Sequence, residues 1–252
     1  MTCLKSNNLP PLVGTMFEGQ RKWSGANWQK TLSEHTNEIE QLLARVQVLD
    51  TWSNLFRKCE TGRDLIPEIF VDGFMSVHLA CMGLYKFANS CLRSELETAL
   101  RLVYFSTHPV EYEWWSQGNA WYRSGMKKDV WGEGYLYFEQ LPYIKDFEKR
   151  CIAEKKIIGR IRRIYSSLSE YVHTGHGAFH TKADTFSPKY NTGDYIRWVS
   201  YFEDVQQCIS IILSLTFIED LKKARPKEQD TILTIGVNEK YYEQRLKKTI
   251  GI

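Results

Sequence analysis

The stretch RIRRIYSSLSEYVHTGHGAFH, residues 160–180, combines a helical repeat, titratable side chains and a glycine that ends the helix. Apolar residues recur at steps of three and four, the spacing of a buried helix face: Ile157, Ile161, Ile164, Leu168 and Val172. A second line beside it is polar: Arg162, Ser166, Ser169 and His173. The sequence therefore predicts an amphipathic helix over residues 152–174. Its polar line is either the solvated side of that helix or part of a functional site.

The rest of the chain is predicted to be helical as well, which makes the fold class all-α. Helical patterns cover residues 27–58, with a break near Asp50, and then 66–89, 91–105 and 192–223; shorter helices are expected at 109–117 and 141–151. Prolines and glycines predict an irregular N-terminal arm at 1–27. A helical bundle then spans 28–223, with an aromatic-rich insertion at 108–151. The tail, 224–252, is expected to hold a short strand at 230–237 and a terminal helix.

Composition narrows the class of protein. The 252 residues carry a formal net charge of +3, too small to imply nucleic-acid binding from the overall field. The six cysteines include no CxxC pair, which argues against a thiolate zinc site. No secretory signal is apparent, and the longest apolar run, 208–218, is too short to cross a bilayer. We therefore expect a soluble cytoplasmic protein with reduced thiols and no membrane partner.

The helix CLRSELETALRLVYF, residues 91–105, carries a second line of charge. Arg93, Glu97 and Arg101 follow one another at steps of four. On a solvated edge this is a ladder of ion pairs, each contributing about 0.2–0.5 kcal/mol. Against a concave surface, the carboxylate would instead fix a guanidinium that holds a phosphate. Both interpretations remain open from the sequence.

Several kinds of chemistry are disfavoured. The chain has no GxxxxGK[ST] loop, no GxGxxG after a strand and no GxSxG elbow. His173, His176 and His180 invite a metal site, but Gly175 and Gly177 break the helix between them, and we expect no bound metal and no other cofactor. His78 fits a hydrogen-bonded core position better than a catalytic one.

His173 suits acid–base chemistry, because imidazole titrates nearest neutrality. Paired with an arginine, it fits cleavage of RNA by attack of the 2′-hydroxyl: the histidine moves the proton and the guanidinium stabilises the phosphorane oxygens. The aromatic insertion, which also contains Arg123, Lys127 and Lys128, could stack bases and contact phosphate. Packing of the insertion on the bundle explains the same residues without a ligand.

LRSELETALRLVYF and YSSLSEYVHTG together resemble the HEPN superfamily, the higher eukaryote and prokaryote nucleotide-binding domain. The likeness covers about residues 65–220 and is greatest to uncharacterised bacterial branches with an Arg-x-x-x-Glu helix and a later Tyr-x-x-Leu-Ser-x-x-x-His helix. It implies an up-and-down bundle of four or five helices, often dimeric. Many members are metal-independent ribonucleases of toxin and antiviral defence systems, and others bind without cutting.

The family's catalytic pattern places an arginine four to six residues before the histidine, and this chain departs from it. Ser166, Ser167 and Leu168 occupy those positions, so an arginine must come from another helix, with Arg93 the best candidate. His173 alone matches the catalytic pattern directly. The looser bacterial pattern is matched by Arg93, Glu97, Tyr165 and Ser169.

These observations lead to one prediction and two rivals. We expect a HEPN-like protein that binds or cleaves RNA in a prokaryotic defence or toxin–antitoxin system, as a homodimer restrained by a protein partner or antitoxin. The expected catalytic residues are Arg93, Glu97, Ser169 and His173, and the expected substrate-binding residues are Arg101, Arg162, Tyr165 and His176. One rival is a non-catalytic interaction or regulatory subunit in which the same residues fix helix register. The other is a metal enzyme built on the three histidines.

Overall fold

The computed structural model describes residues 11–56, 62, 64–118, 134–173, 183–184 and 187–251. The fold is all-α, as predicted. The long helices are α1 (Pro11–Leu55), α2 (Leu65–Cys81), α3 (Tyr85–Phe105), α7 (Ile157–His173) and α8 (Thr192–Thr216). Two very short strands, β1 (Ala183–Asp184) and β2 (Ser187–Pro188), pair antiparallel.

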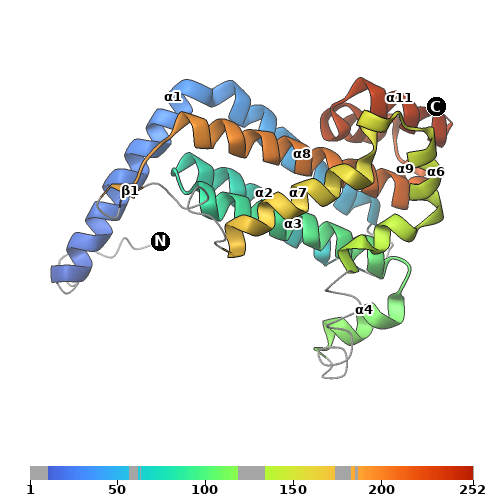
Figure 1. Ribbon diagram of the computed structural model, residues 1–252, viewed down its shortest axis with the longest axis horizontal. Helices are drawn as coiled ribbons and strands as arrows, with labels where there is room; N and C mark the ends of the chain where they lie inside the picture. Colours follow the sequence, from blue (N-terminus) through green and yellow to red (C-terminus); the bar gives the residue numbers. More distant parts are fainter. Residues whose placement is uncertain are drawn as a thin grey trace.

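Shorter elements surround the long helices. They are α4 (Pro109–Ser116), η3 (Gly134–Gln140), α6 (Pro142–Arg150), η4 (Ala153–Lys155), α9 (Ile218–Lys223), α10 (Pro226–Asp230), η6 (Thr231–Val237) and α11 (Lys240–Ile250). Helices α6, α9 and α11 gather at one end of the molecule, whereas the first half of α1 extends past the bundle at the other (Figure 1). No helix within the described ranges is both long and apolar enough to span a membrane.

Helix α3 is the centre of the core, because it packs against α2, α7 and α8. Its apolar side is completely buried, as the 3.6-residue period requires: Leu92, Leu96, Ala99 and Val103. Helix α7 contributes Ile157, Ile161, Ile164 and Leu168, which confirms four members of the predicted apolar line. The fifth, Val172, was predicted wrongly: it lies in the last turn, where 42% of the residue is exposed.

The N-terminal segment corrects one prediction. Residues 11–27 form the start of α1 and not an irregular arm. Pro11 stands at the first helical position, where a missing N–H is harmless. A Cβ added at Gly14, Gly19 or Gly25 would meet nothing within 4 Å, so these glycines lie on an open helix surface and mark no turn. The break in α1 lies at His35 (φ −136°, ψ 21°) and not near Asp50.

Helix boundaries elsewhere are also corrected. The helix predicted at 66–89 ends at Cys81, and Gly83, with φ +76°, makes the turn into α3. The helix predicted at 192–223 is divided at Phe217. Helix α7 begins at Ile157 and not at 152, because Glu148 accepts hydrogen bonds from the backbone N–H groups of Ile157 and Ile158, at 2.5 and 3.2 Å.

The C-terminal tail is part of the core. The strand predicted at 230–237 is wrong, since Thr231–Val237 is a π-helix. Its β-branched residues Ile232 and Val237 are fully buried, so tertiary packing overrides their strand propensity. The terminal helix is confirmed as α11, which buries Tyr242 and Leu246.

Candidate functional site

Arg93 of α3 joins the two helices that carry the predicted site. Its Nε donates to Ser169 Oγ at 3.1 Å, and its Nη2 donates to Tyr165 Oη at 2.9 Å. Its Nη1 lies 3.0 Å from Glu97 Oε2. The guanidinium carbon also lies 5.0 Å from the centroid of the Tyr165 ring, within the range of a cation–π contact. Each nitrogen of this guanidinium therefore has a protein partner.

Glu97 links two arginines on one face of α3. Its other oxygen, Oε1, accepts from Arg101 Nη2 at 2.6 Å. The side chains are mostly buried, with 20% of Arg93, 19% of Glu97 and 29% of Arg101 exposed. Two guanidinium groups and one carboxylate leave the group with a formal surplus of one positive charge. The predicted ion-pair ladder is present, and its first member, Arg93, contacts α7.

Ser169 is held on both sides. Its hydroxyl donates to the backbone oxygen of Tyr165 at 2.7 Å, one turn earlier, while it accepts from Arg93. This back-bond fixes the rotamer of the serine and directs its lone pairs at α3. The arrangement orients Arg93 and leaves the serine hydroxyl with no proton to offer elsewhere. Ser169 thus suits a positioning role.

His173 is the last residue of α7. It lies four positions after Ser169, so the two main-chain positions lie about 6 Å apart along the helix axis and on the same face. The imidazole of His173, together with His176 and His180, lies outside the described residues. That the His173 imidazole faces the Arg93 guanidinium therefore stays a prediction.

Arg162 lies away from this group. It pairs with Glu139 of η3 through Nε and Nη2, and 55% of its side chain is exposed. The polar line predicted along α7 therefore contacts two different elements. Its first member, Arg162, pairs with η3, and its third member, Ser169, contacts α3. Ser166, between them, is exposed.

The described part of the aromatic insertion packs on α3. The Trp115 ring centroid lies 5.3 Å from that of Phe105, and Tyr137 meets Tyr104 edge to face at 4.8 Å. Packing thus accounts for these rings. Arg123, Lys127 and Lys128 lie outside the described residues.

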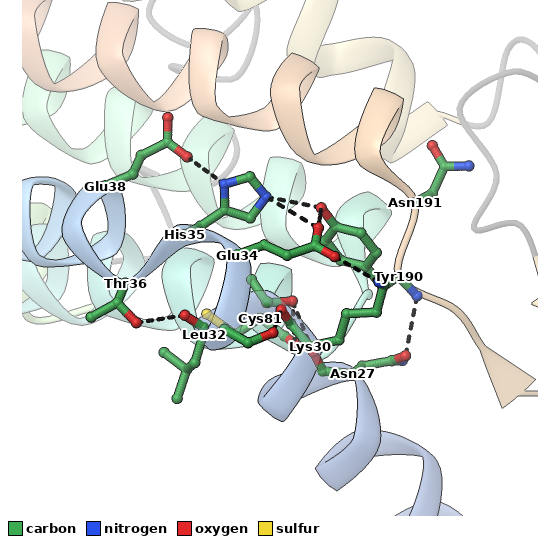
Figure 2. A network of polar contacts seen from close by, with 12 residues as sticks. Asn27, Lys30, Leu32, Glu34, His35, Thr36, Glu38, Cys81, Tyr190 and Asn191 are labelled. Atoms are coloured by element: carbon green, nitrogen blue, oxygen red, sulfur yellow. Dashed lines mark hydrogen bonds and ion pairs between the residues drawn. The ribbon is translucent and has the colours of Figure 1, made fainter.

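A polar cluster that the sequence analysis missed surrounds the break in α1 (Figure 2). His35 Nε2 lies 2.8 Å from Tyr190 Oη, and His35 Nδ1 lies 3.3 Å from Glu38 Oε2. The Tyr190 hydroxyl donates to Glu34 Oε2 at 2.7 Å, and the His35 ring stacks on Tyr195 at 4.0 Å. In the sequence the only signal is EHTNE at 34–38, because Tyr190 is 155 positions away.

This cluster fastens a chain segment. Asn27 donates from Nδ2 to the backbone oxygens of Met82 and Pro188, at 2.9 and 2.8 Å, and its Oδ1 accepts from the backbone N–H of Tyr190 at 3.1 Å (Figure 2). Hydrogen bonds from Lys30 and then from Tyr190 hold the pKa of Glu34 below its ordinary value. The contacts tie α1 to the segment that leads into α8.

A buried carboxyl group lies on the opposite side of α3. Glu95 is completely buried, and Gln206 of α8 donates to its Oε1 at 2.6 Å. Burial raises the pKa of Glu95 to about 8, so the group is mainly a neutral acid at pH 7. Gly73 of α2 makes room for it, since a Cβ there would lie 2.6 Å from Glu95 Oε1.

Within the residues that the structure describes, no three His, Cys, Asp or Glu side chains are arranged to hold a metal ion. His78 is half-buried against Trp28, with ring centroids 5.1 Å apart. Comparison with protein-family models, with curated proteins and with solved structures finds no match to this chain.

Proposed function

We propose that this chain is a HEPN-like protein that binds or cleaves RNA without a metal ion. The observation that supports the proposal is the hydrogen bond from Arg93 to Ser169, one helical turn before His173. It gives a half-buried guanidinium a fixed position beside the end of α7. The defence or toxin–antitoxin setting, the homodimer and the protein partner belong to the proposal through the sequence resemblance alone. The cytoplasmic location belongs to it through the cysteine pattern and the sequence's lack of a secretory signal.

The proposed reaction needs two groups in different roles. His173 takes the proton from the RNA 2′-hydroxyl as its oxygen bonds to phosphorus, and a proton returns to the 5′-oxygen as that oxygen leaves. The products are a 2′,3′-cyclic phosphate and a 5′-hydroxyl. Arg93 stabilises the charge that develops on the phosphorane oxygens. Glu97, Tyr165 and Ser169 hold the guanidinium in place, with Arg101 as a second phosphate-facing cation.

The test is RNA cleavage by purified protein in the presence of EDTA. His173→Ala and Arg93→Ala are each expected to lower the cleavage rate by at least about a hundredfold. The matched control is Arg150→Ala, which removes a guanidinium that is 44% exposed on α6 and should leave the rate unchanged. Far-UV circular dichroism and a thermal melt of each variant separate lost chemistry from lost structure. Cleavage that survives His173→Ala in a folded protein contradicts the proposal.

A second function is favoured by one feature of the same site. Every nitrogen of Arg93 already has a protein partner, which is the arrangement of a buried polar clamp between α3 and α7. In that case the chain is a non-catalytic interaction or regulatory subunit. Arg93→Ala would then lower stability, and His173→Ala would change neither stability nor any RNA-directed activity.

A further inference from the structure

A hollow of about 630 Å³ lies between α1, the first turns of α2 and the π-helix η6. None of the residues that line it belongs to the Arg93 group or to the cluster at His35. Its volume falls within the range of about 300–1,000 Å³ typical of small-molecule sites. The floor is core, since Val48, Leu49 and Ile66 are each at most 3% exposed. Phe70 and Ile235 make the walls.

The wall formed by η6 is built into the fold. A Cβ added at Gly236 would lie 2.8 Å from Ser210 Oγ and 3.1 Å from Val48 Cγ1, so only glycine lets the π-helix approach α8 and α1 this closely. Val48 is both a neighbour of that glycine and part of the floor of the hollow. The π-helical turn carries Thr231 and Ile235 to the cavity. Short π segments are frequent at functional sites.

The rim of the hollow is polar and open to solvent. Among the described residues, the side chains of Gln47, Asp50, Thr51 and Ser53 make no hydrogen bond or ion pair with the protein, although all four line the cavity. Of the described residues that line the hollow, Asp50 alone is charged. An apolar floor below one free carboxylate and several free amide and hydroxyl groups is complementary to a molecule with an apolar body and a positive charge.

We propose that this hollow binds a small amphipathic cation, an apolar ring or chain that carries a protonated amine. The amine pairs with Asp50, the apolar body covers Val48 and Ile66, and Gln47 or Thr51 supplies a hydrogen bond. This site is separate from the proposed RNA site, so failure of either proposal leaves the other standing.

Tryptamine is the probe, with indoleacetate as its anionic counterpart, and binding is followed by NMR titration of the full chain. Tryptamine is expected to shift the signals of Val48, Ile66 and Ile235 in a saturable way, and indoleacetate to bind at least about fivefold more weakly. Asp50→Asn should weaken tryptamine about fivefold and remove the preference for the cation. Asp220→Asn, an exposed aspartate on α9, is the matched control and should bind like the wild type.

Ala44→Trp places an indole in the cavity and should abolish binding of the probe. Three results would overturn the proposal: no saturable shift up to the solubility limit of tryptamine, equal binding of indoleacetate, or an unchanged affinity in Asp50→Asn. The Asp50 variant alters an exposed side chain, so it decides the matter even if Ala44→Trp does not fold.

Discussion

Arg93 of α3 donates a hydrogen bond from Nε to Ser169 Oγ of α7 at 3.1 Å, across 76 positions of sequence. The same guanidinium is braced within its own helix by Glu97, at 3.0 Å. A contact of this kind determines the register of α7 on α3, because one turn of slip would separate a mostly buried charge from its two partners on α7, Ser169 and Tyr165. The hydrogen bond between Arg93 and Ser169 therefore determines both the register of α7 on α3 and the position of the Arg93 charge.

Removal of the Arg93 side chain should destabilise the protein. Arg93→Ala removes the hydrogen bonds that Arg93 donates to the Tyr165 and Ser169 hydroxyl groups, and we expect the free energy of unfolding to fall by about 2–3 kcal/mol. Ser169→Ala should cost about 1 kcal/mol, and the double variant should cost about 1 kcal/mol less than the sum of the two. Urea unfolding of all four proteins gives the coupling.

The control for this cycle is Arg150→Ala, whose guanidinium lies 3.2 Å from Asp146 on the surface of α6, with 44% and 66% of the two side chains exposed. An exposed pair contributes about 0–1 kcal/mol, so stability should barely change. Strict additivity of Arg93→Ala and Ser169→Ala would show that the hydrogen bond between them carries no net free energy.

The sequence was sufficient to identify the side chains of this contact but not the contact itself. Helical period placed Arg93, Glu97 and Arg101 on one face of one helix and Ser169 on the polar face of another, whereas Tyr165 was singled out by the family resemblance. Which of these faces meet depends on packing in three dimensions, where Leu92 and Leu96 of α3 and the buried line of α7 share a core. Arg162 illustrates the limit, since its line on α7 predicted a shared site and its actual partner is Glu139.

Local sequence patterns also predicted the wrong secondary structure where tertiary packing determines it. TILTIGV has the β-branched composition of a strand, yet burial and the close approach at Gly236 make it a π-helix. The glycines of residues 11–27 suggested turns, but they lie on an open helix surface where their cost is modest. The cluster at His35 and Tyr190 is assembled from segments so far apart that no spacing rule could connect them.

Glu95 should make stability depend on pH. Its pKa is about 8 in the folded protein and near the ordinary 4.5 when the chain is unfolded, so the folded state binds the extra proton between those values. Its contribution to stability is fully present below pH 4.5 and is lost as the pH rises towards 8, at about 1.4 kcal/mol for each pH unit. Glu95→Gln stays neutral throughout, so it should gain on the wild type over this range.

The measurement is urea unfolding of the wild type and of Glu95→Gln at several pH values from about 4 to about 9. This range spans the pKa of Glu95 in the unfolded and in the folded protein. The matched control is Glu40→Gln, which replaces an exposed glutamate of α1 and should track the wild type closely. A constant difference between Glu95→Gln and the wild type at every pH would mean that Glu95 ionises alike in both states.

Two glycines in helices should respond in opposite ways to alanine. A Cβ at Gly73 would lie 2.6 Å from Glu95 Oε1, so Gly73→Ala must displace a buried carboxyl group and is expected to cost about 1–3 kcal/mol. A Cβ at Gly19 meets nothing within 4 Å, and Gly19→Ala should add up to about 1 kcal/mol through helix propensity. Thermal and urea unfolding measure the stability of both variants.

If the clash with Glu95 is the cause, Gly73→Ala should lower the free energy of unfolding less in a Glu95→Ala background than it does alone. An equal cost in both backgrounds would assign the loss to another neighbour, of which Gln206 Nε2, at 3.3 Å from the added Cβ, is the nearest.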